Sequence, residues 1–101
     1  MIFRRGRFDE LVRRQLDAFA GDEAELLEEA REGERTYDAA EREDAEEAYS
    51  DFQLVLEAGA ERLAAIRDAY AATLDEETEE AYADAFARAA RKRFPKLTGE
   101  L

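Results

Sequence analysis

Apolar residues recur at helical spacing in the first forty residues of the chain. Between residues 8 and 20 the positions with this spacing are Phe8, Leu11, Val12, Leu16 and Phe19, and they predict a short amphipathic helix. Gly21 then has the position of a C-terminal cap, and Asp22 with Glu25 three residues later has the form of a capping box. We therefore expect a second helix to start at Asp22 and to end near Ala40.

A longer and more regular pattern begins near Asp44. Its apolar positions alternate in steps of four and three, as in a heptad seam, and they are Ala45, Tyr49, Phe52, Leu56, Gly59, Leu63, Ile66, Tyr70 and Thr73. We expect one helix over residues 43–74, roughly 48 Å long at about 1.5 Å per residue. Asp75 is then expected to cap the start of a last helix over residues 76–94, which Pro95 ends.

Two arms of equal length, residues 8–40 and 42–74, predict a long antiparallel hairpin whose first arm is bent or broken near Gly21. The shorter C-terminal helix is expected to pack on this hairpin. The predicted pairs across the hairpin are Leu27 with Leu56, Phe19 with Leu63, Leu16 with Ile66, and Val12 with Tyr70. Reversal of the chain at Gly21 would instead give a four-helix bundle, and the pattern leaves this alternative open.

These elements make the predicted fold class all-α, a small antiparallel helical bundle built on a long helical hairpin. Strong helix formers dominate the composition, and the chain has one proline and five glycines. At 101 residues the chain has the size of one domain. We expect a single helical domain over residues 1–101, with frayed ends at about 1–6 and 96–101.

The stretch "YSDFQLVLEAGAERLAAI", residues 49–66, has apolar side chains on every side of its predicted helix. One stripe faces the first arm, and a second is expected to face the last helix, namely Leu56, Ala60, Ala64, Ala65 and Ala69. Leu54, Val55 and Ala58 belong to neither stripe. They lie either under the first arm where it bends or on a surface for homodimer formation, because a large apolar patch is rarely left in water.

Charge is unevenly distributed along the chain, whose net charge is -12. Five arginines against two acids make residues 1–16 basic, whereas sixteen acids against three arginines make residues 17–57 strongly acidic. In the hairpin the basic "RRGR" of residues 4–7 is expected near the acidic start of the last helix, and "RKR" of residues 91–93 near the acidic first arm. Most of this pattern therefore indicates intramolecular electrostatics and solubility.

The composition excludes several classes of chemistry. There is no cysteine and no histidine, so a thiolate site, a cysteine nucleophile and the Glu-x-x-His pairs of di-iron bundles are all ruled out. No phosphate-binding glycine loop, calcium loop or nucleophile with a basic partner is present. We expect no cofactor and no enzymatic activity. No apolar run approaches the roughly 20 residues of a membrane span, and we expect a cytoplasmic protein.

The function that fits these observations is a non-catalytic structural or protein–protein interaction module. Self-association through Leu54, Val55 and Ala58 as a homodimer is one expectation. The alternative is an acidic regulator or decoy that binds a basic protein, and the high negative charge disfavours binding to nucleic acid. Ionic strength separates these two modes, because salt weakens charge-driven binding and leaves apolar self-association largely unaffected.

Overall fold

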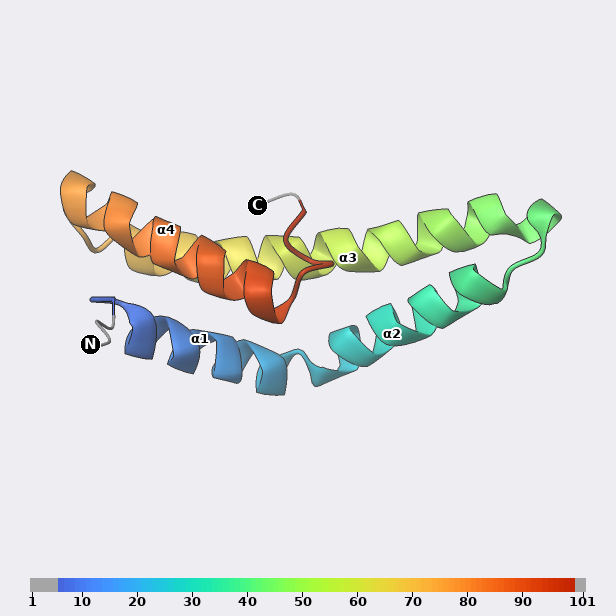
Figure 1. Ribbon diagram of the computed structural model, residues 1–101, viewed down its shortest axis with the longest axis horizontal. Coiled ribbons are helices and arrows are strands. Elements are labelled where there is room, and N and C mark those ends of the chain that lie inside the picture. Colours follow the sequence, from blue (N-terminus) through green and yellow to red (C-terminus); the bar gives the residue numbers. More distant parts are fainter. Residues whose placement is uncertain (1–5, 100–101) are drawn as a thin grey trace, which may run out of the picture.

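In the part of the chain that the structure describes, four helices are connected by short turns (Figure 1). The computed structural model describes residues 6–99. Within that range the helices are α1 (Asp9–Asp22), α2 (Ala24–Ala39), α3 (Arg42–Ala71) and α4 (Glu76–Arg93), and no strand is present. The molecule is elongated, with extents of 51 × 34 × 21 Å. The predicted all-α fold class is confirmed.

Helices α1 and α2 follow one another as the two halves of one bent arm, and α3 returns antiparallel beside them (Figure 1). The predicted hairpin is therefore confirmed, and the chain bends near Gly21 without reversing. Helix α4 lies against both α1 and α3. One end of the molecule is thus a bundle of α1, α3 and α4, from which the α2–α3 hairpin projects.

The predicted capping at the bend is wrong. Helix α1 continues through Gly21 to Asp22, Glu23 is the residue between the two helices, and no side chain caps α2. The Glu23 N–H donates to the Phe19 carbonyl at 2.8 Å, and the Leu27 N–H donates to the Glu23 carbonyl at 3.0 Å. Because helical hydrogen bonding continues across the bend, the chain needs neither a glycine cap in the left-handed region nor a capping box.

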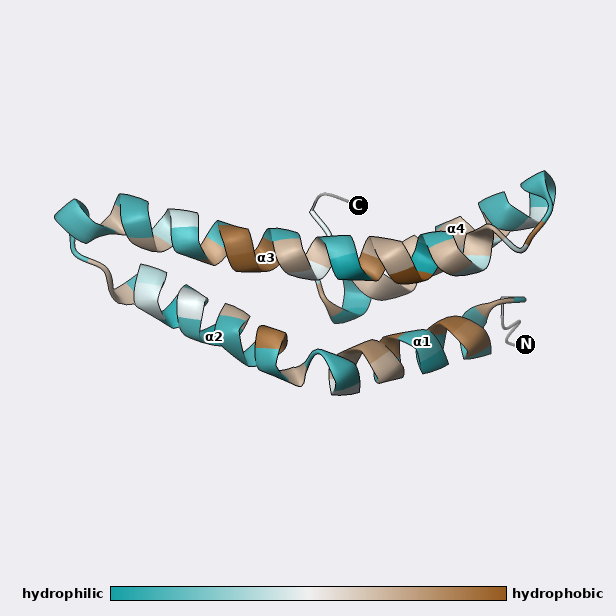
Figure 2. Cartoon of the chain, turned by 180° about the vertical axis from the view of Figure 1, so that it is seen from behind, coloured by the Kyte–Doolittle hydropathy of each residue, from teal (hydrophilic) through white to brown (hydrophobic). Residues whose placement is uncertain are grey.

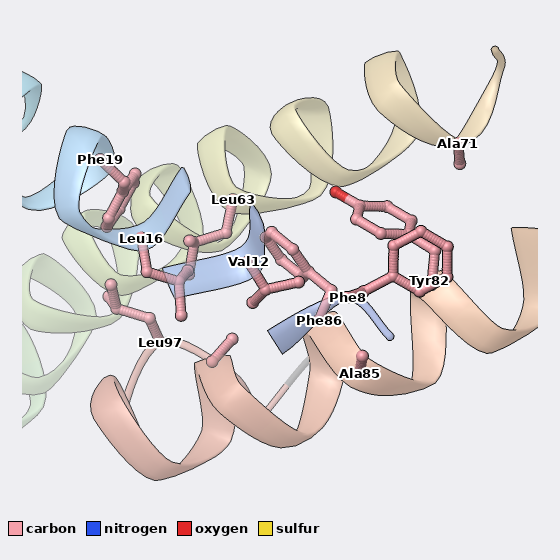
Figure 3. Packing of buried hydrophobic residues seen from close by; sticks show 11 residues of the cluster. Phe8, Val12, Leu16, Phe19, Leu63, Ala71, Tyr82, Ala85, Phe86 and Leu97 are labelled. Atoms are coloured by element: carbon pink, nitrogen blue, oxygen red, sulfur yellow. The ribbon is translucent and has the colours of Figure 1, made fainter. Parts of the chain in front are cut away.

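The core lies in the three-helix end of the molecule (Figure 3). Its buried side chains are Phe8, Val12, Leu16, Phe19, Leu63, Ala71, Tyr82, Ala85, Phe86, Ala90 and Leu97. The Tyr82 ring packs against Phe8, Tyr70 and Phe86, with ring centroids 5.5, 4.8 and 6.0 Å away. Its hydroxyl donates a 2.8 Å hydrogen bond to Gln15 Oε1, and burial raises the pKa of this phenol. Tyr82 therefore joins α1, α3 and α4.

Helices α2 and α3 approach closely at two glycines. A Cβ atom at Gly33 would lie 3.1 Å from Phe52 Cδ1, and one at Gly59 would lie 3.1 Å from Leu26 Cδ2. The predicted register, which pairs Leu27 with Leu56, would place Leu26 beside residue 57. The observed contact with Gly59 is about half a turn further along, because interlocking of large side chains with glycines sets the stagger of the two helices.

Part of the C-terminal segment, for which the sequence predicts fraying at 96–101, packs on the bundle; residues 1–5 and 100–101 of the predicted frayed ends lie outside the described range. Pro95 follows the end of α4 as expected, but Leu97 is only 5% exposed, and Thr98 is buried as well. Leu97 fills the space left by Gly59, where an added Cβ would lie 2.8 Å from its Cδ2 atom. Lys96 forms an ion pair with Glu34. These contacts explain why the segment is ordered.

Ion pairs join the basic and acidic regions much as the sequence predicts. Arg93 pairs with Asp17 on α1, and Lys96 pairs with α2 as described above. The Asp75 carboxylate caps α4 as predicted, accepting a 2.8 Å hydrogen bond from the Thr78 N–H. That hydrogen bond is the main reason why the pKa of Asp75 is lowered, and the charge of Arg7 contributes. Residues 4 and 5 of the basic segment lie outside the described range.

Leu63 provides the most direct test of the core. Its side chain is fully buried, so Leu63→Ala is expected to lower the free energy of unfolding by about 2–5 kcal/mol. The matched substitution Leu54→Ala removes an exposed side chain and should change stability by no more than about 0.5 kcal/mol. Urea unfolding followed by circular dichroism measures both, and equal losses would contradict the packing described.

Gly59 and Gly21 form a second matched pair. At Gly59 a larger side chain would clash with Leu97 and Leu26, so Gly59→Leu is expected to destabilise the protein by about 1–3 kcal/mol. At Gly21 an added Cβ meets no atom within 4 Å, and Gly21→Leu should gain about 0.5–1 kcal/mol from helix propensity. Thermal unfolding of the two variants provides the comparison. Stabilisation of both would show that the C-terminal segment does not occupy the Gly59 position.

Candidate protein-interaction surface

Helix α3 has an outer face that α4 and the first arm leave largely uncovered. Leu54 lies on this face and is 64% exposed, the highest value for a large apolar side chain in the described residues. Positions 54, 58, 65 and 69 recur in steps of four and seven, so Ala58, Ala65 and Ala69 lie on the same face. We call Leu54, Ala58, Ala65 and Ala69 the outer face of α3.

Two residues of the outer face correct the sequence prediction. Ala65 and Ala69 were expected to face the last helix, but both are exposed, whereas Ala60 is buried at 6% exposure. Ala60 and Ala65 are five positions apart, which places them about 140° apart around a helix of 3.6 residues per turn. A single neighbouring helix such as α4 cannot cover both. The uncovered surface is therefore longer than the sequence predicts.

A groove of about 680 Å³ lies where the bend between α1 and α2 passes α3. We call it the elbow groove, and its lining residues are Gly21, Asp22, Glu23, Ala24, Glu25, Leu26, Glu29, Leu54, Val55, Ala58 and Arg62. All three residues of the predicted interaction surface thus line one concavity. Val55 and Ala58 are half-buried beside the bend, while Leu54 stays exposed. The expectation that these residues form a homodimer surface stays a prediction.

Acidic residues surround the apolar part of the elbow groove. Asp22, Glu23, Glu25 and Glu29 line it, and Arg62 is the one basic residue in its lining. Arg62 donates a hydrogen bond to Glu23 across the groove, so its charge is largely offset by that carboxylate. The remaining three acids give the rim a negative potential.

In the part of the chain that the structure describes, neither a cluster of metal-binding side chains nor an unpaired buried polar side chain accompanies the elbow groove. Among residues 6–99 no group of three or more acids is arranged to hold a metal ion. Every buried side-chain nitrogen and oxygen in this range has a hydrogen-bond partner. On α3, Gln53 donates a hydrogen bond to the Tyr49 hydroxyl at 2.7 Å. What remains is an apolar floor with a charged rim.

Sequence reasoning found the α3 side of the groove and missed the side formed by the bend. Gly21, Ala24 and Leu26 carry no recognisable binding motif. A usable signal did exist, because the predicted hairpin register sets Leu26 within two residues of Gly59 and so brings the bend close to Ala58. Figure 2 shows that α3 is most hydrophobic around the middle of its length, on the part that runs beside the bend.

A second depression of about 360 Å³ lies between α1 and α4. Its floor is formed by Val12, Leu16, Ala85 and Ala89, and its basic edge by Arg13, Lys92 and Arg93. Val12 and Leu16 are almost fully buried there, and Arg13 and Arg93 are engaged by Asp17. This depression is smaller and more apolar than the elbow groove, and it lacks the acidic rim.

Comparison of the chain with protein-family models, with curated proteins and with solved structures found no match. None of the helices in the described range is both long enough and apolar enough to pass through a membrane. Inferences about function therefore rest on the geometry and charge of the chain itself.

Proposed function

We propose that the protein is a non-catalytic protein–protein interaction module that binds through the elbow groove and the outer face of α3. The observation that carries this proposal is the 64% exposure of Leu54 at the edge of the groove. A single exposed leucine is common on protein surfaces. Leu54 differs because it adjoins the partly covered Val55 and Ala58, which extend the apolar surface into a concavity.

Helix packing supports this proposal. Ala58, Ala65 and Ala69 have small side chains, so the backbone of a partner helix could approach α3 closely along the outer face. Leu54 would then project beside the partner as an anchor. An interaction of this kind buries apolar surface that the isolated chain exposes to water, and each Å² buried contributes about 25 cal/mol. This favourable free energy is realised when the partner binds, because folding of the isolated chain leaves the surface exposed to water.

Two kinds of partner fit the surface. A second copy of the chain would make the protein a homodimer, and a basic protein would make it an acidic regulator. The acidic rim of the elbow groove favours the basic protein, since two chains that each carry a charge of -12 repel one another at low salt. The apolar outer face alone accommodates either.

A photoreactive amino acid placed at position 54 tests the proposal in the native cell extract. We expect position 54 to form a discrete covalent adduct, while the exposed control position Arg88 on α4 forms none. The mass of the adduct then separates a second copy from another protein. Absence of an adduct at position 54, or equal adducts at both positions, would contradict an interaction module that works through this surface.

A further inference from the structure

Building on the proposed function, we propose that the elbow groove binds a cationic amphipathic helix of another protein. Such a helix carries apolar residues on one face and lysine or arginine beside them. Binding of this kind lays the apolar face of the ligand helix into a hydrophobic groove, with residues spaced by three and four positions as anchors. Both the apolar and the charged parts of the groove match that ligand.

The charges around the groove determine which kind of helix fits. Asp22, Glu25 and Glu29 lie on the bent arm, and the neighbouring Glu23 is already paired with Arg62. The net rim charge is therefore negative. Lysine or arginine at the edges of a bound helix would meet carboxylates, whereas glutamate would meet like charge, and the potential of the rim would guide the approach of a basic ligand.

The floor of the groove provides the apolar contact. Leu26, Val55 and Ala58 are the apolar residues that line it beside Leu54, and the side chain of Ala58 is small. No atom lies within 4 Å of the Cβ position of Gly21, so the side towards the bend is open. A leucine-sized side chain of the ligand could enter between these residues with Leu54 beside it, which would bury its surface and that of Leu54 together.

The chain's own basic residues are poor candidates for this role. Arg93 and Lys96, in the C-terminal basic region, are held in ion pairs with Asp17 and Glu34. The arginines of α1 are similarly engaged, since Arg13 and Arg14 both pair with Glu10. A second copy, with 15 basic against 27 acidic residues, would bring more carboxylates than cations to the acidic rim. The charge balance favours a different, basic protein as the ligand.

Synthetic peptides provide the probe. The test peptide is a helix of about 18 residues, roughly 27 Å long, with leucine at positions spaced by four and three and lysine at the flanking positions. Its twin has glutamate in place of each lysine. We expect fluorescence anisotropy to show binding of the lysine peptide alone, and affinity to fall about tenfold or more when salt is raised from about 0.05 M to about 0.5 M.

Substitutions locate the binding site. Glu25 and Glu29 lie four positions apart on α2 in the rim, and Glu80 and Asp84 lie four apart and exposed on α4. Glu25→Lys with Glu29→Lys should weaken the lysine peptide about tenfold. Glu80→Lys with Asp84→Lys changes the net charge equally and should leave the affinity within about twofold. Leu54→Ser should weaken the same peptide about tenfold or more through loss of the apolar anchor.

Three results would overturn this inference. An equal loss of affinity in the two double substitutions would show that binding depends only on the net charge of the protein. Binding of neither peptide, or equal binding of both, would exclude a cationic ligand. A doubled mass in solution without peptide, insensitive to salt and abolished by Leu54→Ser, would make a second copy the occupant. That last result would contradict only the cationic ligand and would agree with an interaction module. Absence of an adduct at position 54 would contradict both proposals.

Discussion

Tyr82 is the contact on which the arrangement of the helices depends. Its ring lies against Phe8, Tyr70 and Phe86, and its hydroxyl bonds to Gln15. These contacts place α4 against both α1 and α3. Helix α3 in turn contacts α2 and α4. Leu54, Ala65 and Ala69 on its outer face lie outside these contacts and are exposed.

The sequence predicts the helices well because periodicity reports burial directly. The seam from Phe52 to Tyr70, the Asp75 cap and the bent hairpin all come from local patterns. The features that the sequence pattern does not predict depend on contacts between segments that are distant along the chain. The fit of Leu97 to Gly59 orders the C-terminal segment, and the path of α4 decides that Ala65 remains exposed. Neither can be derived from spacing along one helix.

The same limit applies to the candidate site. The pattern identifies Leu54, Val55 and Ala58 because they belong to no predicted seam. It does not show which residues of the first arm lie opposite them. The bend at Glu23 adds Asp22, Glu25 and Glu29 to these residues and so turns an apolar patch into a groove with a negative rim. The bend in the first arm thus places acidic residues beside the uncovered apolar surface of α3.

The proposed interaction surface requires that one particular side of α3 be exposed to water, and thiol labelling measures this directly. The chain contains no cysteine, so Ala65→Cys and Ala60→Cys each introduce a single reporter thiol. We expect the thiol at position 65 to react with a maleimide nearly as fast as an unfolded control, and the thiol at position 60 to react only when the protein unfolds. Equal rates, or faster labelling at position 60, would contradict the central claim.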